Sequence, residues 1–228
     1  MVTMRFAAHR VVAASIAVAI LPAQAFAGTF AVMSYNVRGL PPLVIEDRTD
    51  EIAAIAPLLE DFHTPAGPYV GIDSLVGLQE VFYWPYSNEL TDPQIASYPY
   101  VTDKNTGGPV GIGDGLTLLS DFEIDDVVRL PWDICFGTLG HFGNDCDTNK
   151  GFSFSRVLLE QGLWIDVYTL HADAGQDFGS RIARRGNILQ PVDSIDELSP
   201  AGTPVLAFGD TNSLYSRLGD DNVQELLV

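Results

Sequence analysis

Short apolar runs recur along this chain, and several of them end directly in a polar residue of a kind that binds metal ions or phosphate groups. The clearest runs cover residues 30–35, 74–79, 163–170 and 204–208. Runs of this length and composition predict buried β-strands. If these strands share one sheet edge, the polar residues that follow them converge on one site. These residues are Asn36, Glu80, His171, Asp173, Asp210 and Asn212.

Other segments predict a hairpin and two helices. The stretches 152–159 and 163–170 are separated by Glu160-Gln161-Gly162, which indicates a turn between two strands. Thr49 is a suitable N-cap for a helix with apolar residues on one face, although Pro57 predicts a kink or an early end. Residues 181–198 read as a surface helix. Helices that interleave with hairpins predict mixed sheets and not purely parallel ones.

The first 27 residues have the pattern of a secretory signal peptide. Arg5 and Arg10 precede an apolar stretch at residues 11–21, and Ala25-Phe26-Ala27 provides a cleavage site of the A-x-A type. That stretch is about half of the roughly 20 residues that a membrane-spanning helix needs, and no later stretch is long enough. An uncleaved anchor helix is the alternative. We therefore expect residues 28–228 to form one domain of a secreted protein, extracellular or periplasmic.

The charge balance bears on the choice of substrate. The chain has 12 Lys and Arg residues against 30 Asp and Glu residues, and its only lysines are Lys104 and Lys150. A firm hold on a nucleic-acid backbone needs several basic contacts with phosphates, so the charge disfavours a nucleic-acid partner. It does not exclude a nuclease, because a bound cation changes the local field.

Two cysteines, Cys135 and Cys146, lie close together in a segment rich in Gly and Asp. In an exported chain this spacing favours a structural disulfide. A zinc site would need more soft or imidazole ligands than the nearby His141 supplies.

The polar residues at the strand ends have the side chains that phosphoryl chemistry requires. Glu80 is a hard oxygen ligand, and Mg²⁺ prefers one or two carboxylates together with water and phosphate oxygens. Asn36 can hold a metal-bound water or a phosphate oxygen. Asp210 can orient or deprotonate an attacking water, Asn212 can fix that geometry, and His171 can donate to phosphate oxygens. Each residue alone also fits a plain structural role: a turn residue, a solvated strand end, a core histidine or a helix cap.

Five segments, in order along the chain, resemble the motifs of the endonuclease/exonuclease/phosphatase superfamily, which includes deoxyribonuclease I, neutral sphingomyelinases and inositol polyphosphate phosphatases. Together they extend over nearly all of the expected mature chain. The segments are MSYNVRGL (33–40), VGLQEV (76–81), GDGLTLLS (113–120), DVYTLHADAG (166–175) and VLAFGDTN (205–212).

This resemblance implies an α/β fold of the mixed α+β kind, a four-layer α/β/β/α sandwich with two mixed sheets face to face. It implies that Glu80 binds the metal with Asn36 beside it, that Asp210 and Asn212 position the nucleophilic water, and that His171 contacts the scissile phosphate. Magnesium is the metal implied, and Mn²⁺ or Ca²⁺ satisfies much of the same chemistry.

Three further residues are weaker candidates. Asp173 belongs to the histidine motif, with a surface salt bridge to Arg184 or Arg185 as an equal alternative. Lys150 and Arg156 flank a strand that could face the substrate, with ordinary solvated charges as the alternative.

One family motif has no counterpart. The family closes with a Ser-Asp-His motif, whereas this chain has no histidine after His171 and stops at Val228. We expect a fragment that lacks its last strands, or else a degenerate relative that keeps the metal half of the site. As written, the chain is expected to be catalytically weak or inactive.

The resemblance predicts a secreted, divalent-metal-dependent enzyme that hydrolyses phosphodiester or phosphomonoester bonds. The Gly-Asp-Thr-Asn variant, and the cysteine segment that runs into Lys150-Gly151-Phe152, look most like secreted sphingomyelinase-like members. This favours a lipid headgroup or another small phosphate ester as substrate. The alternatives are a deoxyribonuclease-like nuclease and a noncatalytic module that binds metal or phosphate. The sequence makes no prediction of the oligomeric state.

Overall fold

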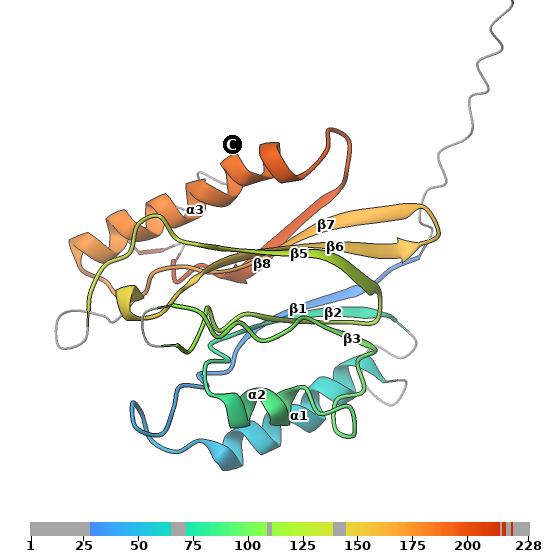
Figure 1. Cartoon of the computed structure of the whole chain (residues 1–228), viewed down its shortest axis with the longest axis horizontal. Helices are drawn as coiled ribbons and strands as arrows, with labels where there is room; N and C mark the ends of the chain where they lie inside the picture. The colour runs from blue at the N-terminus through green and yellow to red at the C-terminus, as the bar shows by residue number, and fades with distance from the viewer. Residues whose placement is uncertain are drawn as a thin grey trace, which may run out of the picture.

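A computed structural model describes residues 28–64, 72–108, 111–138, 145–214, 216–217 and 220. The predicted signal peptide (1–27) and His141 lie outside these residues. In the described part, two four-stranded sheets pack face to face, and helices cover the outer face of each sheet (Figure 1). This is the α/β/β/α sandwich that the resemblance implied.

The first sheet has the strand order β1-β2-β4-β3. β1 and β2 pair in parallel, whereas β4 is antiparallel to both β2 and β3. Helices α1 and α2 cover the outer face of this sheet (Figure 1). The elements are β1 (Ala31–Asn36), α1 (Thr49–His63), β2 (Ser74–Gln79), α2 (Trp84–Leu90), β3 (Tyr100–Val101) and β4 (Thr117–Ser120).

The second sheet has the order β5-β6-β7-β8. β5, β6 and β7 are successively antiparallel, and β8 joins β7 in parallel, so both sheets are mixed as predicted. Helix α3 lies across the outer face (Figure 1). The elements are β5 (Glu123–Pro131), the 3₁₀ helix η1 (Asp145–Asp147), β6 (Gly151–Glu160), β7 (Leu163–His171), α3 (Phe178–Leu198) and β8 (Val205–Asp210).

Two details of the helices differ from the predictions. Thr49 is the first residue of α1 and not its cap, because both its N–H and its hydroxyl bond to Asp47. Pro57 does not end α1, which continues to His63. The buried apolar face of α1 continues on both sides of Pro57, and packing against the sheet outweighs the hydrogen bond that proline removes.

The prediction that residues 181–198 form a surface helix was wrong in part. α3 begins earlier, at Phe178, and its inner face is buried against the second sheet. Arg184 and Asn187 on that face have no solvent exposure. Buried polar side chains on one face of α3 obscure the apolar periodicity by which a packed helix is recognised.

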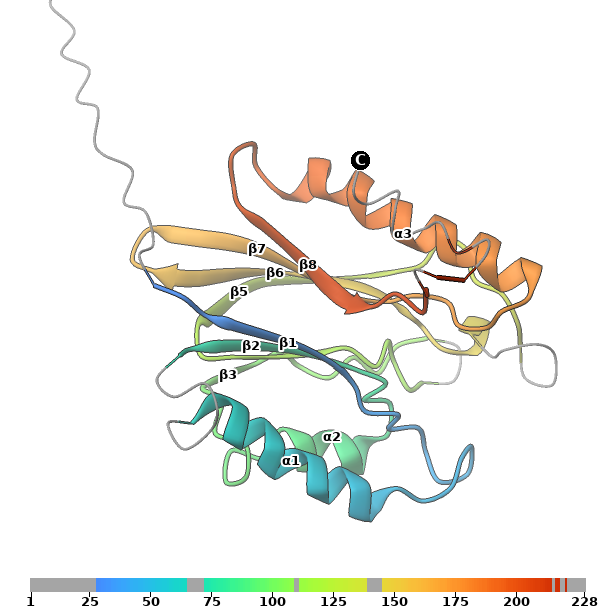
Figure 2. The same ribbon diagram turned by 180° about the vertical axis from the view of Figure 1, so that it is seen from behind.

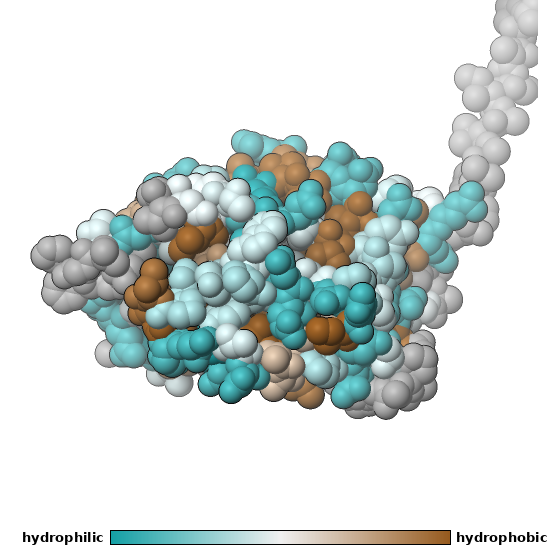
Figure 3. All heavy atoms as spheres, turned by 60° about the horizontal axis from the view of Figure 1, so that its bottom comes forward, coloured by the Kyte–Doolittle hydropathy of each residue, from teal (hydrophilic) through white to brown (hydrophobic). Residues whose placement is uncertain are grey.

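The core between the sheets is apolar and tightly packed. One cluster joins Leu75 and Leu118 of the first sheet to Val157, Ile165 and Val167 of the second. Separate apolar clusters lie beneath α1–α2 and beneath α3. On the face formed by α1 and α2, hydrophobic and hydrophilic residues are interspersed (Figure 3). None of the helices in the described ranges has the length and hydropathy of a membrane span.

Candidate active site

The strands that carry the predicted site residues all end at one edge of the sandwich. β1 and β2 run in parallel, with Asn36 opposite Gln79, so Glu80 follows beside Asn36. β7 and β8 run in parallel, with His171 opposite Asp210. β1 and β8 lie next to each other across the two sheets (Figure 2). The sheets therefore each supply half of one site.

Asn36 joins the two halves. Its Nδ2 donates to Oε1 of Glu80 at 2.8 Å and to Oδ2 of Asp210, also at 2.8 Å. Its Oδ1 accepts from the backbone N–H of Arg38 at 2.9 Å, which fixes the orientation of the amide. One amide group thus holds two carboxylates from different sheets beside each other.

Glu80 has a left-handed backbone conformation, with φ of 61°. This conformation is unfavourable for a residue with a long side chain and is typical of functional sites. The carbonyl of Glu80 accepts from the backbone N–H of Gly39 at 2.9 Å, and a Cβ at Gly39 would lie only 2.8 Å from that oxygen. The turn after β1 therefore holds the turn after β2 and directs the Glu80 carboxylate towards Asn36.

His171 is fully buried behind the carboxylates. Its Nε2 lies 3.8 Å from Oε1 of Glu80 and 3.8 Å from Oδ2 of Asp210. Neither ring nitrogen has a hydrogen-bond partner within the described residues. Burial, with a smaller contribution from the positive charge of Lys150, places the pKa of His171 well below its ordinary value. The imidazole is therefore neutral and keeps one N–H donor and one acceptor.

Asn212 lies two residues after the end of β8 and orients the Asp210 carboxylate. The backbone N–H of Asn212 donates to Oδ1 of Asp210 at 2.8 Å, and its side-chain Nδ2 donates to the carbonyl of Ala172 at 2.9 Å. Like Glu80, Asn212 has a positive φ, here 52°. The structure thus brings Asn36, Glu80, His171, Asp210 and Asn212 together, as the order of the motifs suggested.

Asp173 lies behind this group and is not on the surface. Its side chain is fully buried, and Oδ2 accepts from the backbone N–H of Phe136 at 2.7 Å. The surface salt bridge considered for Asp173 was wrong: Arg184 donates to its backbone carbonyl and pairs with Asp220 at 2.8 Å. Burial, and then the charge of Asp145, raise the pKa of Asp173 to about 7.

Lys150 is buried next to the same segment and forms an ion pair with Asp145. The other carboxylate oxygen of Asp145 accepts from the backbone N–H of Ala174 at 2.9 Å. Sequence reasoning did not single out Asp145. The available signal was its position directly before Cys146, in a segment that the disulfide constrains.

The disulfide between Cys135 and Cys146 is present, with an S–S distance of 2.05 Å and a Cα–Cα distance of 5.3 Å. Cys135 directly precedes Phe136, whose backbone N–H donates to Asp173. Cys146 directly follows Asp145, which forms the ion pair with Lys150. The disulfide therefore holds in place the buried polar layer beneath the site.

Arg156 is not brought to this group. It lies opposite Asp166 on β7, five positions before His171, and its Nε donates to the buried Asp166 carboxylate at 2.9 Å. That contact gives Arg156 a structural role in the second sheet.

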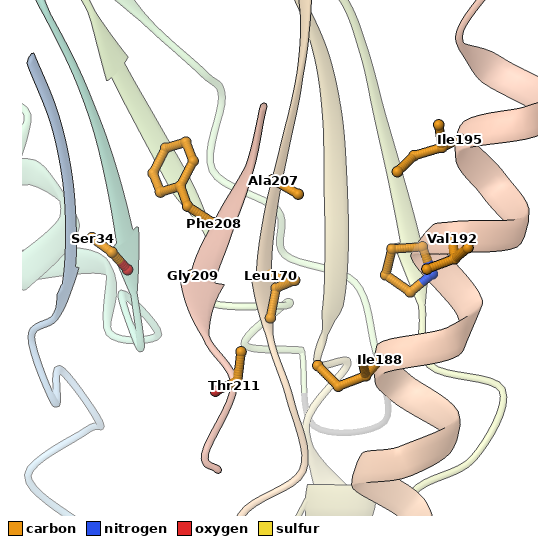
Figure 4. A pocket seen from close by; sticks show the side chains of 10 residues that line it. Ser34, Leu170, Ile188, Val192, Ile195, Ala207, Phe208, Gly209 and Thr211 are labelled. Atoms are coloured by element: carbon orange, nitrogen blue, oxygen red, sulfur yellow. The ribbon is translucent and has the colours of Figure 1, made fainter. Parts of the chain in front are cut away.

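A separate cavity of about 230 Å³ lies between α3 and β8 (Figure 4). Its lining is almost wholly apolar and includes Ile188, Val192 and Ala207. Gly209 and Thr211 also line it and flank Asp210 in the chain. The lining has no carboxylate and no histidine, so this cavity is distinct from the group around Asn36.

The donor set at the strand ends fits a hard divalent cation. Two carboxylates lie close together at a partly exposed position, next to a histidine whose ring nitrogens are unsatisfied. Among the described residues, no three Asp, Glu, His or Cys side chains form a ready-made metal cage. Mg²⁺ does not need one, because it usually keeps several waters and one or two carboxylates. Glu80 and Asp210 are the residues that would hold it.

Comparison with known proteins supports the family resemblance that the motifs indicated. The model of the Endonuclease/Exonuclease/phosphatase family matches residues 33–225. Sphingomyelinases from Mycobacterium tuberculosis and Mycobacterium bovis are 29% identical over 199 residues, which is 86% of this chain. The chain spans 36% of the length of these curated relatives.

Solved structures share the fold. A beta toxin variant from Staphylococcus aureus with bound magnesium ions has a TM-score of 0.68 at 18% identity, covering 85% of this chain and 69% of the toxin. Sphingomyelinase C from Streptomyces griseocarneus has a TM-score of 0.66 at 20% identity, covering 85% of this chain and 68% of the enzyme.

Proposed function

This chain belongs to the endonuclease/exonuclease/phosphatase family, and on that premise we propose that it is a divalent-metal-dependent hydrolase of phosphate esters, with a phosphodiester in a lipid headgroup as the preferred substrate. One observation carries the proposal: the Asn36 amide holds Glu80 and Asp210 from opposite sheets beside the unsatisfied His171 ring. This arrangement presents acceptors for a cation and a donor for a phosphate within one small area.

The residues of the site have separable roles in such a reaction. Asp210, oriented by the Asn212 backbone, accepts the proton of an attacking water or aligns that water. His171 is neutral and donates its single N–H to a phosphate oxygen, where negative charge increases as the water attacks. Glu80 and the Oδ2 oxygen of Asp210 would hold the cation, and the Asn36 amide keeps these two carboxylates beside each other. A bound Mg²⁺ supplies Lewis-acid polarisation of the phosphoryl group.

The relatives and the charge both support the proposed substrate class. The curated proteins matched are sphingomyelinases, and a similar beta toxin structure holds magnesium ions. The net charge of −18 disfavours a nucleic-acid backbone as the ligand. A headgroup phosphodiester carries one phosphate and so does not require an extended basic surface.

We also propose that the protein is exported. The basic and apolar pattern of residues 1–27 supports this, and so does the Cys135–Cys146 disulfide, because such bonds persist in oxidising compartments. Mass spectrometry of the protein recovered from the culture medium or periplasm tests the proposal. A mature N-terminus at Gly28 is expected, and retention of residues 1–27 would count against it.

The test of function is hydrolysis of labelled sphingomyelin, a chromogenic phosphodiester and plasmid DNA in parallel, with Mg²⁺ and with chelator. Glu80→Gln is the test variant, and Glu197→Gln on α3 is the matched control. We expect weak, metal-dependent turnover of the lipid, which chelator abolishes and Glu80→Gln lowers at least about 100-fold, as for loss of a catalytic electrostatic group.

Other outcomes discriminate between the alternatives. Cleavage of DNA alone would favour a nuclease. Phosphate and Mg²⁺ binding without turnover of any substrate would favour a noncatalytic binding module. Activity that survives both chelator and Glu80→Gln would refute the proposed site.

A further inference from the structure

Both lysines of this chain lie at the same end of the sandwich as the carboxylates. Lys150 directly precedes β6, whose first residue is beside the end of β7. Lys104 follows β3, which runs in the same direction as β2 because both are antiparallel to β4. The chain therefore leaves β3 at the edge where it leaves β2 with Glu80. In a chain with a net charge of −18, both lysines are concentrated at one edge.

The two lysines have different surroundings. Lys150 is buried and neutralised by Asp145. Lys104 is half-buried, and its Nζ donates to the backbone carbonyl of Phe82 at 2.8 Å. Within the described ranges, Lys104 forms no ion pair with a carboxylate. An ammonium group has three donors, so two donors of Lys104 remain for a ligand.

Lys104 is held in position on the β2 side of the site. Its Nζ lies 5.4 Å from the centre of the Trp84 ring, within the range of a cation–π contact. Phe82, which supplies the carbonyl, is two residues after Glu80, and its ring centre is 6.5 Å from that of His171. The carbonyl and the indole fix an unpaired positive charge next to the segment that carries the metal-binding carboxylate.

We propose that Lys104 is a substrate-binding residue whose ammonium group, supported by the Phe82 carbonyl and the Trp84 ring, binds an anionic oxygen of the substrate's phosphate group. This rests on the proposed function, since it places the phosphate between Lys104 on the first sheet and His171 on the second. The partial burial of an unpaired cation, which lowers the pKa of Lys104 to about 8, is compensated when an anion binds.

The small number of lysines makes a direct test practical. With ¹³C-labelled lysine, the full chain gives two Cε signals, and Lys104→Met assigns them. The probe is phosphorylcholine, titrated in the presence of Mg²⁺ between about pH 6.5 and 9.5. We expect phosphorylcholine to raise the pKa of Lys104 above about 8, because a nearby anion favours the ammonium form, and to leave the Lys150 signal in place.

Variants add a second readout that does not depend on turnover. Lys104→Met should weaken phosphorylcholine binding about tenfold or more, the usual effect of losing a charge-assisted hydrogen bond. Lys104→Arg keeps the charge and should restore most of the affinity. Arg185→Met, an exposed position on α3, removes the same charge and should have little effect. The affinity of the parent protein for phosphorylcholine should also fall as pH rises through about 8, because Lys104 then loses its charge. The affinity of Lys104→Arg should not fall, because arginine keeps its charge.

The results separate this proposal from the function on which it rests. If the parent binds phosphorylcholine and Lys104→Met binds it equally well, or the Lys104 signal does not respond, the role of Lys104 is refuted and the site around Glu80 stands. If the folded parent binds no phosphorylcholine at all, both the site and the role of Lys104 are refuted.

Discussion

Replacing Asp173 with Asn is expected to stabilise the folded chain above neutral pH and to have little effect in mild acid. The Asp173 carboxylate is fully buried, its Oδ1 has no hydrogen-bond partner in the described part of the chain, and Asp145 lies nearby. An Asn side chain has the same shape. Its oxygen can still accept from Phe136, and it carries no charge that burial penalises.

The sign and size of the change in the free energy of unfolding follow from the pKa of Asp173. The pKa of Asp173 is about 7 in the folded chain, against an ordinary value of 3.8. Between these values the folded chain binds a proton that the unfolded chain lacks, so the free energy of unfolding decreases as pH rises and levels off above about pH 7. From about pH 5.5 to 8.5, roughly 1.5 pKa units of this titration are crossed, which corresponds to about 2 kcal/mol. Structural relaxation around the buried charge lowers the figure to about 1–2 kcal/mol.

Urea unfolding of parent and Asp173→Asn at several pH values between about 5.5 and 8.5 measures this difference. The variant should gain about 1–2 kcal/mol over the parent across that range. Asp193→Asn, on α3, is the control for loss of one negative charge and should show no such trend. A difference that does not change with pH, or a variant that is less stable than the parent at about pH 8.5, would show that Asp173 is ionised and satisfied in the folded chain.

Three further predictions concern stability and are measured by chemical or thermal unfolding. Gly209→Ala should destabilise the fold by about 2 kcal/mol or more, because the new Cβ would lie 2.1 Å from the carbonyl oxygen of Leu170; an unchanged melting temperature would contradict this packing. Arg184→Leu should cost up to about 3 kcal/mol, because the buried Asp220 would keep only the partly exposed Arg217 as an ionic partner, and Arg184→Leu with Asp220→Leu should recover part of the loss. Reduction of the disulfide at Cys135 should cost about 2–3 kcal/mol for a loop of this size, and equal urea midpoints with and without reductant would refute a stabilising role.

The sequence predicted correctly those elements whose residue pattern was clear. The strands that end in site residues were recognisable because each combines a buried apolar run with a polar residue at its exit, and β1, β2, β7 and β8 lie within a residue or two of the predicted ranges. The convergence of Asn36, Glu80 and His171 followed from the shared edge. It did not follow from any one residue, since each alone had a plain structural interpretation.

Elements outside this pattern were missed. β5 is rich in acidic residues and mostly exposed, so it lacks the apolar alternation that identifies a strand; it is recognised only by pairing with β6. α2 is short and begins Trp-Pro, a sequence that reads locally as a turn. Asp145 was missed for a related reason, because its importance comes from the buried contact with Lys150 and not from its neighbours in the sequence.

The site and the core between the sheets depend on each other. Asn36 and Asp210 belong to different sheets, and the 2.8 Å contact between them persists only while the sheets remain at their present separation. At Gly77 on β2 the separation is so small that a Cβ would lie 2.6 Å from the Phe208 ring of β8. Packing at Gly77 and Phe208 thus sets the distance across which the Asn36 amide holds the carboxylates. A substitution in this part of the core should weaken the proposed metal binding before it unfolds the chain, whereas a substitution beneath α1 should affect stability alone.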